Sequence, residues 1–143
     1  MTTQRTEPLS PEDFQQLSQG RLPGLVGLQM LSAEPGRVQA RLDVRPELLA
    51  PNGYLHAATV VALADTACGY GALRSRPEGS TGFTTIEIKT NFLGTVREGA
   101  IACDARLVHG GRTTQVWDAP VVDEATGKAI ALFRCTQMIL WPK

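Results

Sequence analysis

The chain is short of net charge, of aromatic residues and of cysteine, and each shortage narrows the class of protein. Fourteen Lys and Arg side chains balance fourteen Asp and Glu, so the formal net charge of the 143 residues is zero. A neutral chain has no basic field with which to bind nucleic acid or an anionic membrane surface. Aromatic residues make up only 6%, but hydrophobic residues make up 43%, which is too many for a disordered chain. We therefore expect one globular domain over residues 1–143, with a flexible tail over residues 1–9.

The scarcity of cysteine and histidine argues against a disulfide framework and against a metal site. Cys68, Cys103 and Cys135 are odd in number, widely spaced and set among apolar residues, which predicts buried thiols in a reducing compartment. Because the sequence has no C-x-x-C pair and only two histidines, no metal ion is expected. The first seven residues are polar and lack the apolar region of a secretory signal, so we expect a cytoplasmic protein.

Hydrophobic periodicity and turn residues predict two helices and six strands. Ser10 is a typical helix N-cap, and Pro11 suits the first helical position. The expected elements, in chain order, are a helix from Ser10 to about Gln19, strands over 25–33 and 38–44, a long helix over 55–73, a strand from Phe83 onward, and strands over 101–108, 113–123 and 128–140. In the strand from Phe83, one face carries Ile86, Ile88 and Thr90, and the other carries Thr85, Glu87, Lys89 and Asn91.

This order of elements indicates an α+β fold. One antiparallel sheet of about six strands would wrap on one long central helix, with a short N-terminal helix beside it. The helix over 55–73 is apolar almost all round, so one sheet face cannot cover it. A second subunit is the simplest cover for its remaining side.

Asp65 is the only charged side chain between Leu48 and Leu73. A carboxylate in apolar surroundings is normally paired, hydrogen-bonded or protonated, and burial raises its pKa. A raised carboxyl pKa suits a general base at neutral pH. A structural Asp, hydrogen-bonded to Thr66 or to the backbone of a neighbouring subunit, explains the residue equally well, so both interpretations stay open.

The start of the long helix is a candidate oxyanion hole. Residues 51–57 lead into the helix, and the backbone N–H groups of its first turn have no acceptor within the helix. One such donor, aimed at a carbonyl oxygen, contributes about 3 kcal/mol to transition-state stabilisation. Every helix start has these donors, however, and Asn52 can simply cap or turn the chain.

Helix geometry limits how these groups can act together. Ala57 and Asp65 lie eight residues apart, about 12 Å along a helix axis, so one carbonyl group cannot contact both. A shared site therefore requires a second, antiparallel copy of the helix, that is, a two-fold dimer. His56 lies nine positions before Asp65 and half a turn out of phase, so we expect it to be structural or to orient a carbonyl group rather than to act as a base.

Three segments between residues 48 and 140 carry the motifs of one known family. They are Gly53-x-x-His56 followed by Leu63-Ala64-Asp65-Thr66-Ala67; residues 84–99 with Asn91-Phe92-Leu93; and Gly111-Arg112-Thr113-Thr114 with Gly127-Lys128 and residues 131–134. Together they resemble the hotdog-fold acyl-CoA thioesterases of the 4-hydroxybenzoyl-CoA thioesterase superfamily, closest to the phenylacetic-acid-pathway (PaaI-like) branch.

The resemblance implies roles for particular residues. Asp65 would be the catalytic carboxylate, acting as a base on water or as a nucleophile, and Ala57 would supply the oxyanion N–H. The implied substrate-binding residues are Asn52, Gly53, His56, Thr85, Arg97, Gly111, Arg112 and Thr113; Arg97 and the turn over 109–114 would hold the CoA nucleotide and pantetheine. The resemblance also implies a homodimer with shared active sites that pairs into a homotetramer, an acyl-CoA substrate, and no metal or cofactor.

The sequence departs from the family pattern at two places. The family's His-Gly-Gly is His56-Ala57-Ala58 here, and the usual Asn or Gln six residues before the His falls on Ala50. The expected function is hydrolysis of a small or aromatic acyl-CoA. A non-catalytic acyl-CoA binding or sensing protein is the alternative, which the two alanines favour. A hydratase with the hotdog fold is a weaker hypothesis. It needs an Asp five residues before the His, and that position, 51, is proline here.

Overall fold

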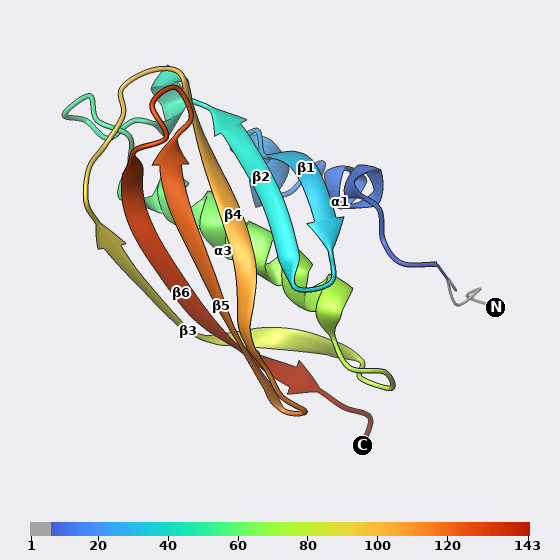
Figure 1. The fold of residues 1–143 in the computed structure, drawn as a ribbon. Coiled ribbons are helices and arrows are strands. Elements are labelled where there is room, and N and C mark those ends of the chain that lie inside the picture. Colours follow the sequence, from blue (N-terminus) through green and yellow to red (C-terminus); the bar gives the residue numbers. More distant parts are fainter. Residues whose placement is uncertain (1–6) are drawn as a thin grey trace.

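The computed structural model describes residues 7–143, so residues 1–6 of the expected tail lie outside the described residues. The elements in chain order are α1 (Pro11–Ser18), α2 (Leu22–Leu25), β1 (Gln29–Glu34), β2 (Arg37–Asp43), a 3₁₀ turn (Pro46–Leu48), α3 (Ala57–Ser75), β3 (Gly82–Phe92), β4 (Ala100–Gly110), β5 (Thr114–Asp123) and β6 (Ala129–Leu140). Figure 1 shows the sheet curving around α3, with α1 beside β1. The predicted α+β architecture is confirmed.

The six strands form one antiparallel sheet in the order β1-β2-β4-β5-β6-β3. The hairpin of β1 and β2 and the turn at Gly110 are as predicted. β3 precedes β4 in the sequence but pairs with β6, the last strand, and so lies at one edge of the sheet. Its other edge has no partner strand among the described residues.

The prediction for the first strand is wrong at its start. Leu22–Leu25 forms the short helix α2, and β1 begins only at Gln29. Pro23 lies in the first turn of α2, where its missing N–H and restricted φ angle favour a helix start. The Leu25 N–H donates to the Arg21 carbonyl at 3.0 Å. The segment therefore turns once before it enters the sheet.

A β-bulge in β3 changes which face Thr85 occupies. The pairing with β6 shifts between Thr85, which lies opposite Gln137, and Glu87, which lies opposite Thr136. Ile86 is the extra residue of the bulge. Thr85 therefore shares the inner face with Ile88, and the prediction that placed Thr85 on the same face as Glu87 is wrong.

The core lies between α3 and the inner face of the sheet. Trp117 on β5 is fully buried and packs so closely on α3 that a Cβ atom at Gly71 would lie 2.5 Å from its ring. Cys68, Cys103 and Cys135 are free and buried, as predicted. The side of α3 turned away from the sheet is only half-buried; it carries Val61, Ala62, Asp65, Thr66, Gly69 and Leu73. Within residues 7–143, no helix is long and apolar enough to span a membrane.

Candidate functional site

His56 caps α3 and determines which backbone donors remain available at its start. The residue has extended backbone angles, and its Nδ1 accepts a hydrogen bond from the Ala58 N–H at 2.9 Å. Because Nδ1 is the acceptor, the neutral ring carries its proton on Nε2. That Nε2–H is a donor on an exposed side chain, as an orienting role requires.

The Ala57 N–H has no acceptor among the described residues. Ala57 is exposed and lines a hollow of ≈ 210 Å³ together with Tyr54, Val60, Phe92 and Thr95. The backbone here has no residue other than glycine with a positive φ angle, so alanine adopts this conformation without strain. Alanine in place of the family's glycine thus preserves both the helix start and the free N–H.

Asp65 lies halfway along α3, and one oxygen of its carboxylate has no hydrogen-bond partner among the described residues. Its Oδ1 is fully enclosed and has no hydrogen-bond partner among the described residues, and no hydrogen bond joins the side chain to Thr66. Burial raises the pKa of the Asp65 carboxyl above its ordinary value. A carboxylate in this state is a stronger base than an exposed one.

Asp65 lines a second hollow, of ≈ 250 Å³, with Thr85 opposite it on β3. The Thr85 hydroxyl donates to Oε1 of Gln137 at 2.7 Å, and Gln137 is fully buried on β6. Because that bond uses the hydroxyl proton, the Thr85 oxygen presents lone pairs to the hollow. The remaining lining residues are Pro23, Thr66, Gly69, Tyr70, Leu73 and Phe83.

The hollows at Ala57 and Asp65 have no lining residue in common. The two residues are eight positions apart on α3, about 12 Å at 1.5 Å per residue. A single thioester carbonyl therefore cannot contact both within one chain. The inner face of β3 beside the hollows is also uncovered, since Ile88 and Phe92 are 47% and 48% exposed.

Asn52, Gly53 and Arg97 lie at the Ala57 end of the molecule. Oδ1 of Asn52 accepts the Tyr54 N–H at 3.1 Å, and Gly53 has a φ angle of +86°, so both residues shape the turn before α3. The Arg97 guanidinium lies over the Tyr54 ring, 4.3 Å from its centre. Arg97 is thus held against a residue that lines the Ala57 hollow.

The turn with Gly111, Arg112 and Thr113 lies at the opposite end of α3. Gln115, just after the turn, donates from Nε2 to the carbonyl of Ser75, the last residue of α3. The Arg112 guanidinium lies 4.7 Å from the centre of the Trp141 ring. The structure therefore does not bring this turn and Arg97 together within one chain.

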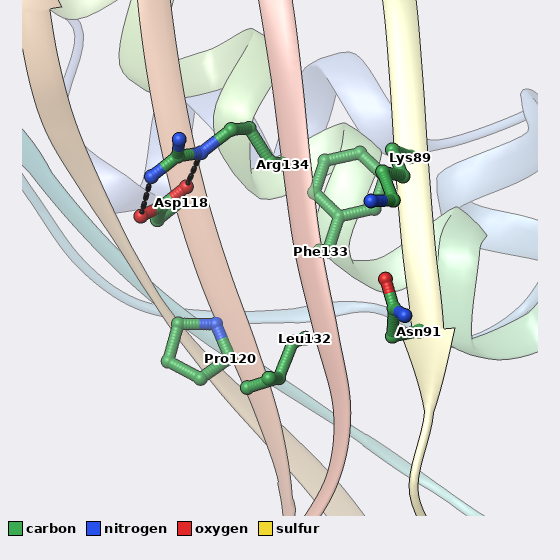
Figure 2. Close-up of a pocket in the computed structure, with 7 residues that line it drawn as sticks. All are labelled: Lys89, Asn91, Asp118, Pro120, Leu132, Phe133 and Arg134. Carbon is green, nitrogen blue, oxygen red and sulfur yellow. Dashed lines mark hydrogen bonds and ion pairs between the residues drawn. The ribbon is translucent and has the colours of Figure 1, made fainter.

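A further hollow, of ≈ 400 Å³, lies on the outer face of the sheet, away from α3 (Figure 2). Arg134 donates from Nε and a terminal nitrogen to the two oxygens of Asp118, at 2.5 and 2.8 Å. Lys89 and Leu132 lie on the same surface. The one carboxylate in this hollow is held in this ion pair, and none of the predicted site residues lines the hollow.

The sequence reasoning missed Gln137, Tyr70 and Pro23. Gln137 acts on the hollow through Thr85, which lies 52 positions away along the chain. Tyr70 follows Thr66, which also lines the hollow, by four positions, so helical periodicity could have placed these two residues on one face. Pro23 reaches the hollow from α2, and nothing in its local sequence signals that contact.

Comparisons with known proteins agree with this geometry. A model of the thioesterase superfamily matches residues 52–130. The 1,4-dihydroxy-2-naphthoyl-CoA hydrolase of Listeria monocytogenes is 34% identical over 111 residues, which cover 78% of this chain and 89% of that protein. A solved thioesterase from Haemophilus influenzae is 25% identical, with a TM-score of 0.86 over 94% of this chain and 92% of its own. A thioesterase family protein from Silicibacter pomeroyi is 30% identical, with a TM-score of 0.80 over 90% and 95%. The family match includes both Ala57 and Asp65.

Proposed function

Because the chain belongs to the thioesterase superfamily and is a thioester hydrolase with the hotdog fold, we propose that its substrate is the CoA thioester of a small or aromatic acid. The name of the Listeria relative, which specifies an aromatic acyl-CoA, supports this choice. We further propose that residues 1–143 form one domain of a cytoplasmic homodimer that pairs into a tetramer. The PaaI-like branch stays a prediction.

One observation carries the proposed site: Asp65 and the Ala57 N–H are each unpaired, and each lies in its own hollow. Two copies of α3 packed antiparallel about a two-fold axis would bring the Asp65 hollow of one subunit against the Ala57 hollow of the other. The half-buried outer side of α3 and the exposed inner face of β3 supply apolar surface for this contact. The dimer then has two equivalent sites.

The proposed chemistry is hydrolysis through a tetrahedral intermediate. Asp65 of one subunit removes one proton from water, whose oxygen attacks the thioester carbon, and the Thr85 oxygen accepts a hydrogen bond from the O–H that stays on that water. The carbonyl oxygen becomes an oxyanion, stabilised by the Ala57 N–H of the other subunit. Collapse of the intermediate breaks the C–S bond, so that CoA leaves as a thiolate and the free acid remains.

Direct attack by the Asp65 carboxylate is the second route, and isotope labelling separates the two. In the base route, one oxygen of water enters the product acid in the first turnover. In the nucleophilic route, an acyl anhydride forms on Asp65, and water attack at the Asp65 carbonyl carbon leaves the label on the protein. A single-turnover reaction in ¹⁸O-water, followed by mass spectrometry of acid and protein, distinguishes these outcomes.

The arrangement of basic residues supports binding of a CoA nucleotide. In an antiparallel pair of α3 helices, Arg97 of one subunit and the Gly111–Thr113 turn of the other come to the same end of the site. Arginine binds phosphate groups through paired N–H donors. Asn52 and Gly53 contribute by shaping the turn that carries Tyr54 beneath Arg97. The exposed His56 side chain contributes its Nε2–H as a donor.

A non-catalytic acyl-CoA binding protein is the alternative, and Ala57-Ala58 is the feature that favours it. The unstrained backbone at Ala57 weighs against it, since the oxyanion donor survives the replacement of glycine.

A panel of acyl-CoA thioesters, with colorimetric detection of released thiol, tests the proposal. We expect the native protein to hydrolyse aromatic or short acyl-CoAs, and Asp65→Asn to bind them without turnover. If the native protein binds acyl-CoA but hydrolyses none, the binding function replaces the enzyme.

A further inference from the structure

One wall of the Asp65 hollow comes from a segment outside the family match. Pro23 of α2 lines the hollow beside Tyr70, whereas the thioesterase superfamily model matches only residues 52–130. Residues 10–28 carry α1 and α2, neither of which is part of the sheet-and-helix core. This N-terminal segment therefore lies outside the residues that the family model matches, and it reaches the candidate acyl site.

The N-terminal segment also fixes the orientation of Tyr70. Phe14 of α1 is fully buried and stacks on the Tyr70 ring, with 4.7 Å between ring centres and 25° between ring planes. The Tyr70 hydroxyl lies 2.7 Å from Oγ of Ser18, which is also fully buried. Since the Ser18 hydroxyl donates its one proton to the Phe14 carbonyl, Tyr70 is the donor to Ser18. Stacking and this bond together prevent the ring from turning out of the hollow.

Hydrogen bonds hold the N-terminal segment near both of its ends, and with it the wall that Pro23 forms. Gln15 of α1 donates from Nε2 to the Leu28 carbonyl at 2.8 Å, and its Oε1 accepts the Met30 N–H at 2.9 Å. One side chain thus joins α1 to the start of β1. Between these anchors, the Pro23 carbonyl accepts the Leu28 N–H at 2.9 Å, which holds Pro23 to the anchored end of the segment.

The remaining walls make the hollow narrow. A Cβ atom at Gly69 would lie 3.2 Å from Cζ of Phe83, so the Phe83 ring lies directly against the helix backbone. Within one chain the hollow measures ≈ 250 Å³, and in the proposed dimer the second subunit would cover its open side. The walls Pro23, Tyr70, Leu73 and Phe83 are apolar or aromatic. Such a space suits a compact, flat acyl group.

We propose that the N-terminal segment, residues 10–28, determines acyl specificity by closing one end of the Asp65 hollow with Pro23 and with the Tyr70 ring that Phe14 and Ser18 hold in place. Compact aromatic acyl groups fit between the rings of Tyr70 and Phe83, whereas extended alkyl chains meet the Pro23 wall. This inference rests on the proposed acyl-CoA hydrolysis and adds the residues that select the substrate.

The test compares benzoyl-CoA with decanoyl-CoA as substrates of the full chain. We expect the native kcat/KM to favour benzoyl-CoA by at least about tenfold, a ratio typical of steric discrimination in apolar pockets. Pro23→Ala and Tyr70→Ala open the end of the hollow, so each should shift the ratio toward decanoyl-CoA by about tenfold. Leu25→Ala is the matched control, because Leu25 belongs to the same segment but is 69% exposed and does not line the hollow.

Each outcome decides the inference. Equal native kcat/KM for the two thioesters, or variants that hydrolyse both at the native ratio, overturns the role of the segment and leaves the proposed function intact. Hydrolysis of no thioester at all, neither these two nor any of the acyl-CoA panel, overturns the proposed function and this inference with it. Hydrolysis of other panel members but of neither of these two overturns this inference alone. If Tyr70→Ala does not fold, as its thermal unfolding would reveal, the half-buried Pro23→Ala variant decides the question alone.

Discussion

Burial of Asp65 lowers the stability of the folded protein at neutral pH and also makes its carboxylate a stronger base. An enclosed carboxylate oxygen without a partner is unfavourable in its charged form, and burial raises the pKa of this carboxyl. The folded state therefore binds the proton more tightly than the unfolded state does. Stability from this group is full below the unfolded pKa of about 3.9 and declines as pH rises through the interval up to the raised folded pKa.

The first prediction is that Asp65→Asn stabilises the protein while it abolishes turnover. At pH 7 the variant should unfold at a higher temperature than the native protein, because the amide removes an unpaired charge. The difference should vanish below about pH 3.9, where Asp65 is protonated in both states. Turnover should fall by at least about 10²-fold, the contribution of a general base. Thermal unfolding across pH and a thiol-release assay measure the two effects; a variant less stable than the native protein at pH 7 would show that Asp65 is a structural residue.

The second prediction concerns the single N–H of Ala57. Proline is tolerated at the first position of a helix, and the extended backbone of His56, with φ −66° and ψ 136°, suits a residue before proline. Ala57→Pro should therefore remove the N–H without unfolding α3, and lower kcat by about 10²–10³-fold. Ala57→Gly, which keeps the N–H, is the control. Circular dichroism with kcat measurements checks this, and native kcat in the proline variant would exclude an oxyanion role.

At the scale of elements, the sequence predicts regular structure better than local irregularity. The spacing of the apolar residues along the sequence predicts the long apolar helix and the strands around it. The Ser10 cap was also predictable, because it depends only on the first turn of α1, where the Asp13 N–H donates to Ser10 Oγ. The bulge at Ile86 was not predictable, because the alternation of apolar and polar residues along β3 gives no sign of an inserted residue. The contacts of Gln137 and Pro23 with the site also escaped prediction, because they join segments distant in sequence. Asp65 was recognisable because a lone charge in an apolar helix is a local signal.

The third prediction compares two glycines of α3. Alanine in a helix interior is intrinsically more favourable than glycine by about 1 kcal/mol. At Gly71, however, the new Cβ would lie 2.5 Å from the buried Trp117 ring, so Gly71→Ala should destabilise the fold by about 1–3 kcal/mol despite that gain. At Gly69, the 3.2 Å contact with Phe83 requires only a small shift, and we expect little net change in stability. Urea unfolding of both variants is the measurement, and equal stabilities would contradict the packing argument.

At the scale of the whole molecule, the described chain contains two half-sites rather than one site. Asp65 and Ala57 occupy separate hollows, and both lie beside surface that a second copy can cover. Assembly would then be a condition of activity and not merely of stability.

The fourth prediction is that two inactive variants complement each other. Homodimers of Asp65→Asn and of Ala57→Pro should each be nearly inactive. After subunit exchange, half of the dimers are mixed and each mixed dimer has one intact site, so activity should return to about a quarter of the native value. If both groups acted within one chain, mixing would restore nothing. The experiment mixes the purified variants in equal amounts and follows thiol release over time.

The position of β3 in the sheet also has a consequence for the order in which the protein is built. β3 ends at Phe92, but β6, its one neighbouring strand among residues 7–143, ends at Leu140. On the ribosome, the backbone N–H and C=O groups of β3 must therefore wait without strand partners until nearly the whole chain has been synthesised. The last strand to emerge closes the sheet, and the surface against which a second subunit would pack forms only then.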